Sequence, residues 1–288
     1  MRTKNVKDAG VSLPLLFLLA SAAAHAGVVY EVETTYHSGS GGSESETTQM
    51  SVNQPNLKMG VEGAGSSDPD AGEAIFRGDR REMVVVDHGD KTYMVIDSAA
   101  AERMGGQVQE AMQGLEEQLS HLDPKQREMV EQMMKKGIGG MALPGAEPPP
   151  KPTKEYRNTG ERATKAGYPC VKYEVLEDGQ MIQELWVTGW DNVKGATESR
   201  KVFEDMASFY AEIMAAFKQS SGMATGFLGG ENALESFAKL EGFPVVTRDF
   251  YGSELQNETV LQSVTERDLD PDAFEPPKGY RLRTMGPQ

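Results

Sequence analysis

Carboxylates are the most abundant chemically active groups in this 288-residue chain, which has 44 Asp and Glu against 29 Lys and Arg. Asp68, Asp70 and Glu73 lie close together, a spacing that can offer oxygen ligands to Ca²⁺, but the rest of a calcium-loop signature is missing. General acid–base catalysis needs two carboxylates in different environments at a defined separation. Adjacent pairs such as Glu116-Glu117 do not specify this, so we expect these acids to be solvated surface charges.

Nucleophilic, metal and phosphate chemistry have no motif to support them. The sequence contains no G-x-S-x-G, no H-E-x-x-H and no Walker loop, and the Gly-rich segment 222–230 lacks the GK[ST] ending. The single cysteine, Cys170, cannot form an internal disulfide, and we predict that it is a small apolar residue on a strand. The sequence therefore predicts a non-enzymatic protein that uses no cofactor and no metal.

Methionines are unusually frequent in the predicted helices. Met adapts its shape and is common on binding surfaces that accept several partners. Packing of these side chains against the sheet is the simpler interpretation. Copper binding by thioethers is disfavoured, because no Met-x-Met cluster accompanies a His. The residues concerned are Met104, Met112, Met129, Met133 and Met134.

The N-terminus has the three parts of a secretory signal peptide. Arg2, Lys4 and Lys7 precede an apolar run over 11–24, and Ala24-His25-Ala26 forms an A-x-A cleavage site. The run is shorter than the roughly 20 apolar residues of a membrane anchor, so no membrane-spanning segment is expected. We predict cleavage after Ala26 and export to a bacterial periplasm.

The acidic balance limits the partners of the chain. The formal net charge is −15, and it becomes −17 once the three cations and one acid of residues 1–26 are removed. Phosphate repels such a chain, so nucleic acid is not an expected partner.

The pattern of short strands and tight turns predicts an α+β fold, with helices packed on one face of an antiparallel sheet of roughly eleven strands. Residues 27–288 are expected to form one domain, with a helical insertion over 98–136 and a Pro/Gly-rich linker over 137–153. A long helix is expected over 197–217, capped by Thr197. The predicted strands cover 27–37, 44–52, 57–62, 73–77, 81–88, 91–97, 154–162, 169–176, 181–187, 243–250 and 255–264.

Four segments resemble an uncharacterised family of exported bacterial proteins that is defined as a domain of unknown function. The resemblance is carried by VYEVETT at 29–35, FRGDR at 76–80, GYPC at 167–170, WVT at 186–188 and LDP at 269–271, with Phe274. It implies export and a single domain, but no activity. The order of elements is also similar to that of periplasmic lipoprotein carriers of the LolA and LolB type. That likeness implies a curved half-barrel whose concave face receives acyl chains.

The clearest local prediction is a hairpin over 169–187 with a type I′ turn at Asp178-Gly179. A two-residue turn pairs Val175 with Ile182, Tyr173 with Glu184 and Val171 with Trp186. One face of the hairpin is then apolar and aromatic, and the Tyr173 hydroxyl is placed to bind Glu184.

These observations lead to a functional hypothesis with one alternative. We expect the concave face and the helix over 197–217 to enclose a cavity for a lipid or another hydrophobic ligand. The alternative is an interaction module with a filled core, in which the sheet edge or the Met-rich helices bind an envelope protein. The predicted cavity residues are Val171, Tyr173, Val175, Ile182, Trp186, Met206, Phe209, Ile213 and Phe217.

Overall fold

The computed structural model describes residues 27–38, 41–60, 72–121, 123, 153–221 and 239–284. The strands are β1 (Gly27–His37), β2 (Ser43–Asn53), β3 (Asn56–Gly60), β4 (Glu73–Arg77), β5 (Glu82–Asp87), β6 (Thr92–Ile96), β7 (Lys154–Lys165), β8 (Tyr168–Glu177), β9 (Gln180–Thr188), β10 (Phe243–Tyr251), β11 (Glu254–Arg267) and β12 (Arg281–Leu282). The helices are α1 (Ser98–Ser120) and α3 (Ala196–Ser221), with short 3₁₀ turns η1 (Trp190–Asn192) and η2 (Pro271–Phe274).

All twelve strands belong to one sheet, in the order β12-β6-β5-β4-β3-β2-β1-β11-β10-β9-β8-β7. Every pairing is antiparallel except that of β12 with β6. The predicted α+β class is confirmed. Each of the eleven predicted strands is present within a few residues of its expected bounds, and β12 was not foreseen.

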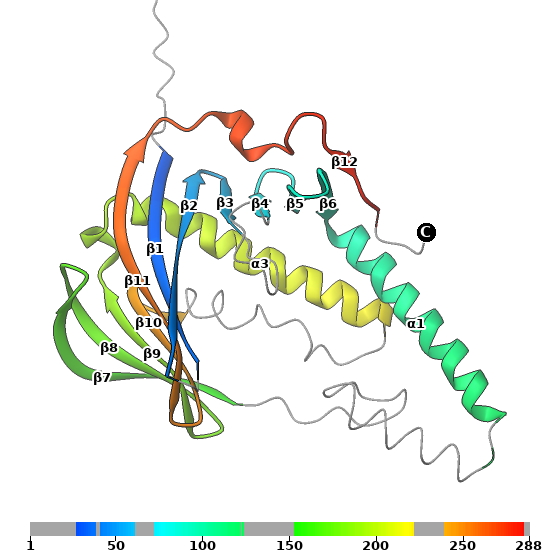
Figure 1. Cartoon of the computed structure of the whole chain (residues 1–288), viewed down its shortest axis with the longest axis horizontal. Coiled ribbons are helices and arrows are strands. Elements are labelled where there is room, and N and C mark those ends of the chain that lie inside the picture. The colour runs from blue at the N-terminus through cyan, green and yellow to red at the C-terminus, as the bar shows by residue number, and fades with distance from the viewer. Residues whose placement is uncertain are drawn as a thin grey trace, which may run out of the picture.

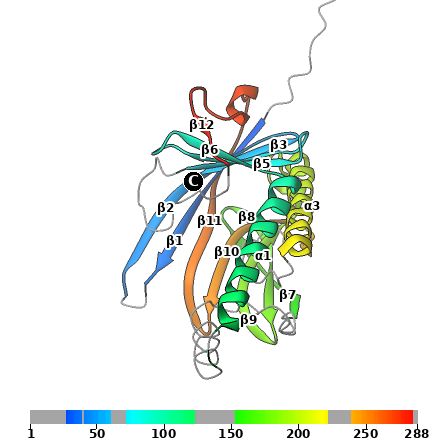
Figure 2. The same cartoon turned by 90° about the vertical axis from the view of Figure 1, so that its right-hand side faces the viewer.

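The sheet curves strongly, and both helices lie on the same side of it (Figures 1 and 2). Helix α3 runs along the inside of the curve, and α1 packs against α3. Helix α3 begins at Ala196, one residue earlier than predicted. Thr197 is therefore not the cap but a first-turn residue, and its hydroxyl donates to Asp191 Oδ1 over 3.2 Å.

Several sequence predictions concern residues outside the described ranges. They are the signal peptide over 1–26, the linker over 137–153 up to residue 152, the helix that follows Asp123, and the Gly-rich segment 222–230.

A buried tyrosine joins α3 to the centre of the sheet. Tyr30 of β1 has no exposed surface, and its ring stacks on Phe243 with 5.4 Å between centroids. Its hydroxyl donates to Ser199 Oγ of α3 over 2.8 Å, so the one polar atom of the ring has a partner. Burial raises the pKa of Tyr30 to about 12. The phenol is therefore a structural group that stays neutral at ordinary pH.

The C-terminal tail forms a strap across the short strands β4 to β6. Phe274 is 2 % exposed and packs with Ile75, Val84 and Val86, which holds the tail against these strands. On the same strap, Glu275 forms ion pairs with Arg77 and with Arg80, the latter at 2.6 Å. Strand β12 then closes the β6 edge of the sheet.

A glycine allows the two helices to touch. At Gly105 of α1, a Cβ atom would lie 1.8 Å from Ser220 Oγ and 2.8 Å from the Phe217 carbonyl oxygen of α3. At its neighbour Gly106, a Cβ would meet nothing within 4 Å. The sequence identifies both glycines only as weak points of a helix. The structure shows that Gly105 is needed for the close approach of α1 to α3.

We therefore predict opposite effects for two adjacent substitutions. Gly105→Ala should lower the free energy of unfolding by about 1–3 kcal/mol, because the helices must move apart. Gly106→Ala should leave it unchanged or raise it by up to about 1 kcal/mol, because alanine favours the helix and meets no neighbour. Urea unfolding of both variants beside the wild type measures the difference. Equal effects at the two positions would contradict the packing role of Gly105.

Candidate functional site

The hairpin of β8 and β9 has the predicted turn but not the predicted register. Asp178 and Gly179 have φ angles of 49° and 83°, as a type I′ turn requires, and Glu177 pairs with Gln180. A register shift between Val175 and Leu176 then adds one residue to β9. Such a bulge moves every later pair by one position.

The three predicted cross-strand pairs are therefore wrong. Val175 pairs with Gln183, Tyr173 with Leu185 and Val171 with Val187. The predicted bond between Tyr173 and Glu184 is also wrong, since the Tyr173 hydroxyl accepts from Asn158 Nδ2 over 3.1 Å.

The shift places the predicted hairpin residues on two faces. Val171, Tyr173 and Val175 share one face of β8, whereas Trp186 pairs with Lys172 and lies on the other. Val175 belongs to a small cluster with Leu185, Val187 and Leu240, against which Tyr173 and Ile182 pack.

The helical half of the predicted set lies at or near the main core. Met206 and Phe209 are 4 % and 2 % exposed, and the Phe209 ring lies 5.4 Å from that of Phe76. Ile213 packs on the same core and Phe217 is half-buried near the end of α3. Met206 and Phe209 thus fill space between helix and sheet.

A continuous row of side chains crosses seven strands on the face that α3 covers. Tyr30 contacts α3, so Tyr36, six residues further along β1, points to the same face. Direct cross-strand neighbours share a face, so the row can be followed from one register pair to the next. It consists of Glu44, Tyr36, Asn257, Asp249, Gln183, Val175 and Tyr156.

A pocket of about 340 Å³ lies over the β7–β10 end of this row. Its volume is near the lower limit for small-molecule sites. Its wall combines aromatic and aliphatic side chains with a few polar groups. The lining residues are Lys154, Tyr156, Val175, Glu177, Ile182, Gln183, Asp249, Phe250 and Tyr251. We call this space the β7–β10 pocket, and two of the predicted ligand residues, Val175 and Ile182, line it.

Asp249 is the half-buried carboxylate of the pocket. Gln183 Nε2 donates to Asp249 Oδ1 over 2.7 Å, and the Asn257 side chain is its second partner. Burial raises the pKa of Asp249, and these two neutral amides offset only part of that effect. A group that supplies positive charge or further donors would stabilise the carboxylate.

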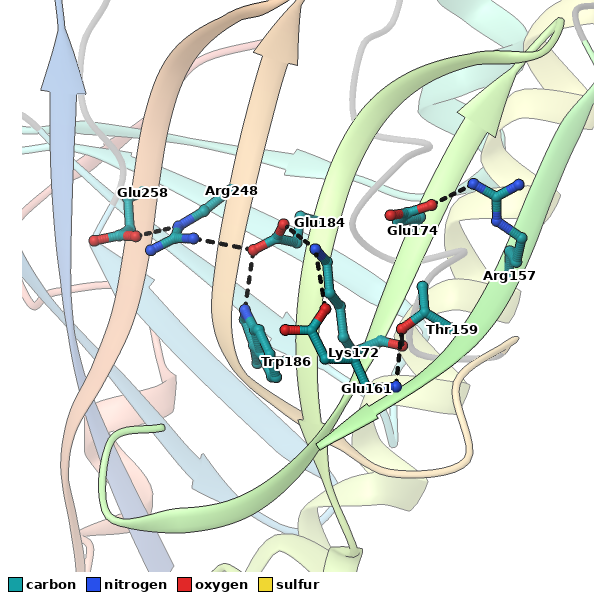
Figure 3. A network of polar contacts seen from close by, with 9 residues as sticks. All are labelled: Arg157, Thr159, Glu161, Lys172, Glu174, Glu184, Trp186, Arg248 and Glu258. Atoms are coloured by element: carbon teal, nitrogen blue, oxygen red, sulfur yellow. Dashed lines mark hydrogen bonds and ion pairs between the residues drawn. The ribbon is translucent and has the colours of Figure 1, made fainter. Parts of the chain in front are cut away.

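A charged network occupies the opposite face of the same strands. Figure 3 shows it on the side of β8–β11 turned toward the viewer, with α3 passing behind the strands. At its centre, Glu184 accepts from Lys172 at 2.9 Å, from Arg248 at 3.0 Å and from Trp186 Nε1 at 3.0 Å. Arg248 also binds Glu258. Glu184 is 8 % exposed, and a buried carboxylate needs such partners.

Glu184 and Asp249 have opposite electrostatic environments. Burial alone would raise the pKa of Glu184, but the hydrogen bonds of Lys172 and Trp186, with the charges of Lys172 and Arg248, lower it. Two carboxylates with divergent pKa values are the usual basis of acid–base catalysis. Here they lie on opposite faces of the sheet, so they cannot act on one substrate.

Cys170 agrees with its predicted role as a small strand residue. It is 4 % exposed on β8, and burial raises the pKa of its thiol, which keeps the reactive thiolate form scarce. Within the described ranges, no three His, Cys, Asp or Glu side chains are arranged to hold a metal ion. In the same ranges, no helix combines the length and apolar character that crossing a bilayer requires.

Comparison with known proteins adds little to this geometry. No family model matches the chain, and no curated protein is significantly similar to it. A solved structure described as "Structure of PNGF-II in C2 space group" aligns with 9% sequence identity and a TM-score of 0.36. The alignment covers 89% of this chain but only 30% of that one. A TM-score this low supports neither a shared fold nor a shared function.

The two carboxylates give a prediction about pH. Because the pKa of Asp249 is raised on folding, its ionisation costs stability as pH rises above the unfolded value of about 3.9. Asp249→Asn should therefore gain stability relative to the wild type between about pH 4 and pH 7. The lowered pKa of Glu184 has the reverse sign, so Glu184→Gln should lose stability relative to the wild type as pH rises toward the unfolded value of about 4.3, and the difference should stay constant above it.

Urea unfolding beside the wild type measures these differences, at about pH 4 and about pH 7 for Asp249→Asn and at about pH 3 and about pH 5 for Glu184→Gln. A pH-independent difference for either variant would show that its carboxyl titrates alike in the folded and unfolded chain.

Proposed function

We propose that this chain is a non-enzymatic exported protein that binds a lipid or another amphipathic ligand in the β7–β10 pocket. The observation that carries the proposal is the composition of the pocket wall. Aromatic and aliphatic side chains make up one part of it, and Gln183 and Asp249 form a polar end. Small-molecule sites have this combination of an apolar wall with a few orienting polar groups.

Burial of apolar surface would contribute part of the affinity, and the polar groups of the wall would contribute the rest. Each CH₂ group of the ligand removed from water contributes about 0.8 kcal/mol. Tyr251 is 81 % exposed and lines the pocket, so a bound ligand would also shield an aromatic ring that is otherwise in water. A ligand of this kind stabilises the folded chain by mass action.

The site differs from the one expected from the sequence. That expectation placed the ligand between the sheet and α3, where Met206 and Phe209 now occupy the space. The β7–β10 pocket keeps Val175 and Ile182 and adds residues of β7 and β10. Export and a carrier role like that of LolA-type proteins remain part of the proposal.

A docking role for the sheet edge is less well supported. Strand β7 is the outer strand at one edge, and a bulge between Asn158 and Arg162 interrupts it. Gly160, in this bulge, has a φ of 75°. Charges and bulges are the features that keep edge strands from pairing with other chains. The charged residues of β7 are Lys154, Glu155, Arg157, Glu161, Arg162 and Lys165.

Two substitutions test the pocket. Val175→Trp should fill it and abolish ligand retention, and Tyr251→Ser should remove an exposed wall and weaken retention several-fold. Native mass spectrometry and lipid extraction of the purified protein measure retention, and thermal unfolding shows whether each variant is folded. Tyr36→Ser is the matched control, because Tyr36 is an exposed tyrosine on the same row but does not line the pocket.

The wild type should retain a ligand that the control also retains. Absence of any bound ligand in the wild type, or equal retention by Tyr251→Ser and Tyr36→Ser, would refute a binding site at this position.

Export has its own test. Protein recovered from a periplasmic fraction should have an intact mass that starts at Gly27, because cleavage is expected after Ala26. A mass that still includes residues 1–26, or the absence of the protein from that fraction, would contradict export by this signal.

A further inference from the structure

The charges at the β7–β10 pocket favour one class of ligand head group. Its described lining contains two carboxylates, Asp249 and Glu177, and one cation, Lys154. Lys154 and Glu177 are direct cross-strand partners at the β7–β8 side of the pocket. Among the described residues, the hydrogen-bond partners of Asp249 are the amides of Gln183 and Asn257, which supply no positive charge when the carboxylate ionises.

Three aromatic rings line the pocket that contains this carboxylate. Tyr156, Phe250 and Tyr251 line the same pocket, and Tyr156 lies on the cross-strand row that contains Asp249. A cation near the face of an aromatic ring is attracted by the ring quadrupole, whereas an anion is not. A carboxylate with aromatic walls therefore suits an organic cation.

We propose that the ligand of the β7–β10 pocket is an amphipathic organic ammonium compound, whose cationic head binds Asp249 and whose apolar body lies along Tyr156, Val175 and Ile182. This inference rests on the proposed function and adds the charge of the ligand to it. The head group replaces the water that Asp249 loses in the pocket with a charge-assisted hydrogen bond. A fatty-acid carboxylate is disfavoured at the same position by repulsion from Asp249.

Three probes with one apolar chain and different heads test the proposal. Octylammonium, octanol and octanoate are titrated against the full chain at about pH 7, with binding followed by calorimetry. Octylammonium should bind at least about tenfold more tightly than octanol, and octanoate more weakly than octanol, because hydrogen bonds to charged groups contribute more than neutral ones.

Two variants that each lose one negative charge test whether Asp249 causes the preference for the ammonium head. Asp249→Asn should bring the affinity for octylammonium close to that for octanol. Asp79→Asn removes the same charge from an exposed turn at the β4–β5 end of the sheet and should change nothing.

The results distinguish failure of the ammonium ligand from failure of the binding pocket itself. Equal affinity for the three heads, a preference for octanoate, or no effect of Asp249→Asn would overturn the ammonium ligand while leaving a binding pocket. No binding of any probe to the wild type would overturn both proposals together.

Discussion

The bending of one continuous sheet around α3 is the constraint on which the rest of the molecule depends. Five strand pairings contain a register shift, and all five involve strands of the half formed by β1, β11, β10, β9, β8 and β7. The described pairings among β2, β3, β4, β5 and β6 are regular. Bulges bend strands and increase their twist. The irregular half can therefore curve, which brings Phe243 of β10 onto Tyr30 of β1, where both rings contact Phe203 of α3.

Local features of the sequence predicted the elements well, because each depends on nearby residues. Strand β1 has the predicted bounds, since its β-branched run ends at a Ser/Gly cluster. The type I′ turn follows from Asp178-Gly179 alone. The predicted β8–β9 register beyond that turn was wrong, because the bulge at Val175 and Leu176 depends on the curvature of the whole sheet. A two-residue turn carries no information about that curvature.

Only some of the pocket residues could be predicted from the sequence, for a similar reason. Val175 and Ile182 were identified through their apolar character. Asp249 was missed because its partner Gln183 lies 66 positions away, and one acid among 44 has no distinguishing local pattern. Glu184 was identified, but its partner Lys172 depends on the shifted β8–β9 register, and its partner Arg248 lies on β10, 64 positions away. The β8–β9 bulge thus decides which residues of β8 lie opposite Gln183 and Glu184.

The strap at the C-terminus has a consequence for the order of events during synthesis. Strand β6 is complete at residue 96, but its free edge is covered only by Arg281 and Leu282, near the other end of the described chain. An uncovered strand edge is a template for pairing with other chains. A growing chain must therefore carry an open β6 edge until residues 281 and 282 have been made. The ion pairs of Glu275 and the burial of Phe274 are the contacts that end this exposure by drawing the tail across the sheet.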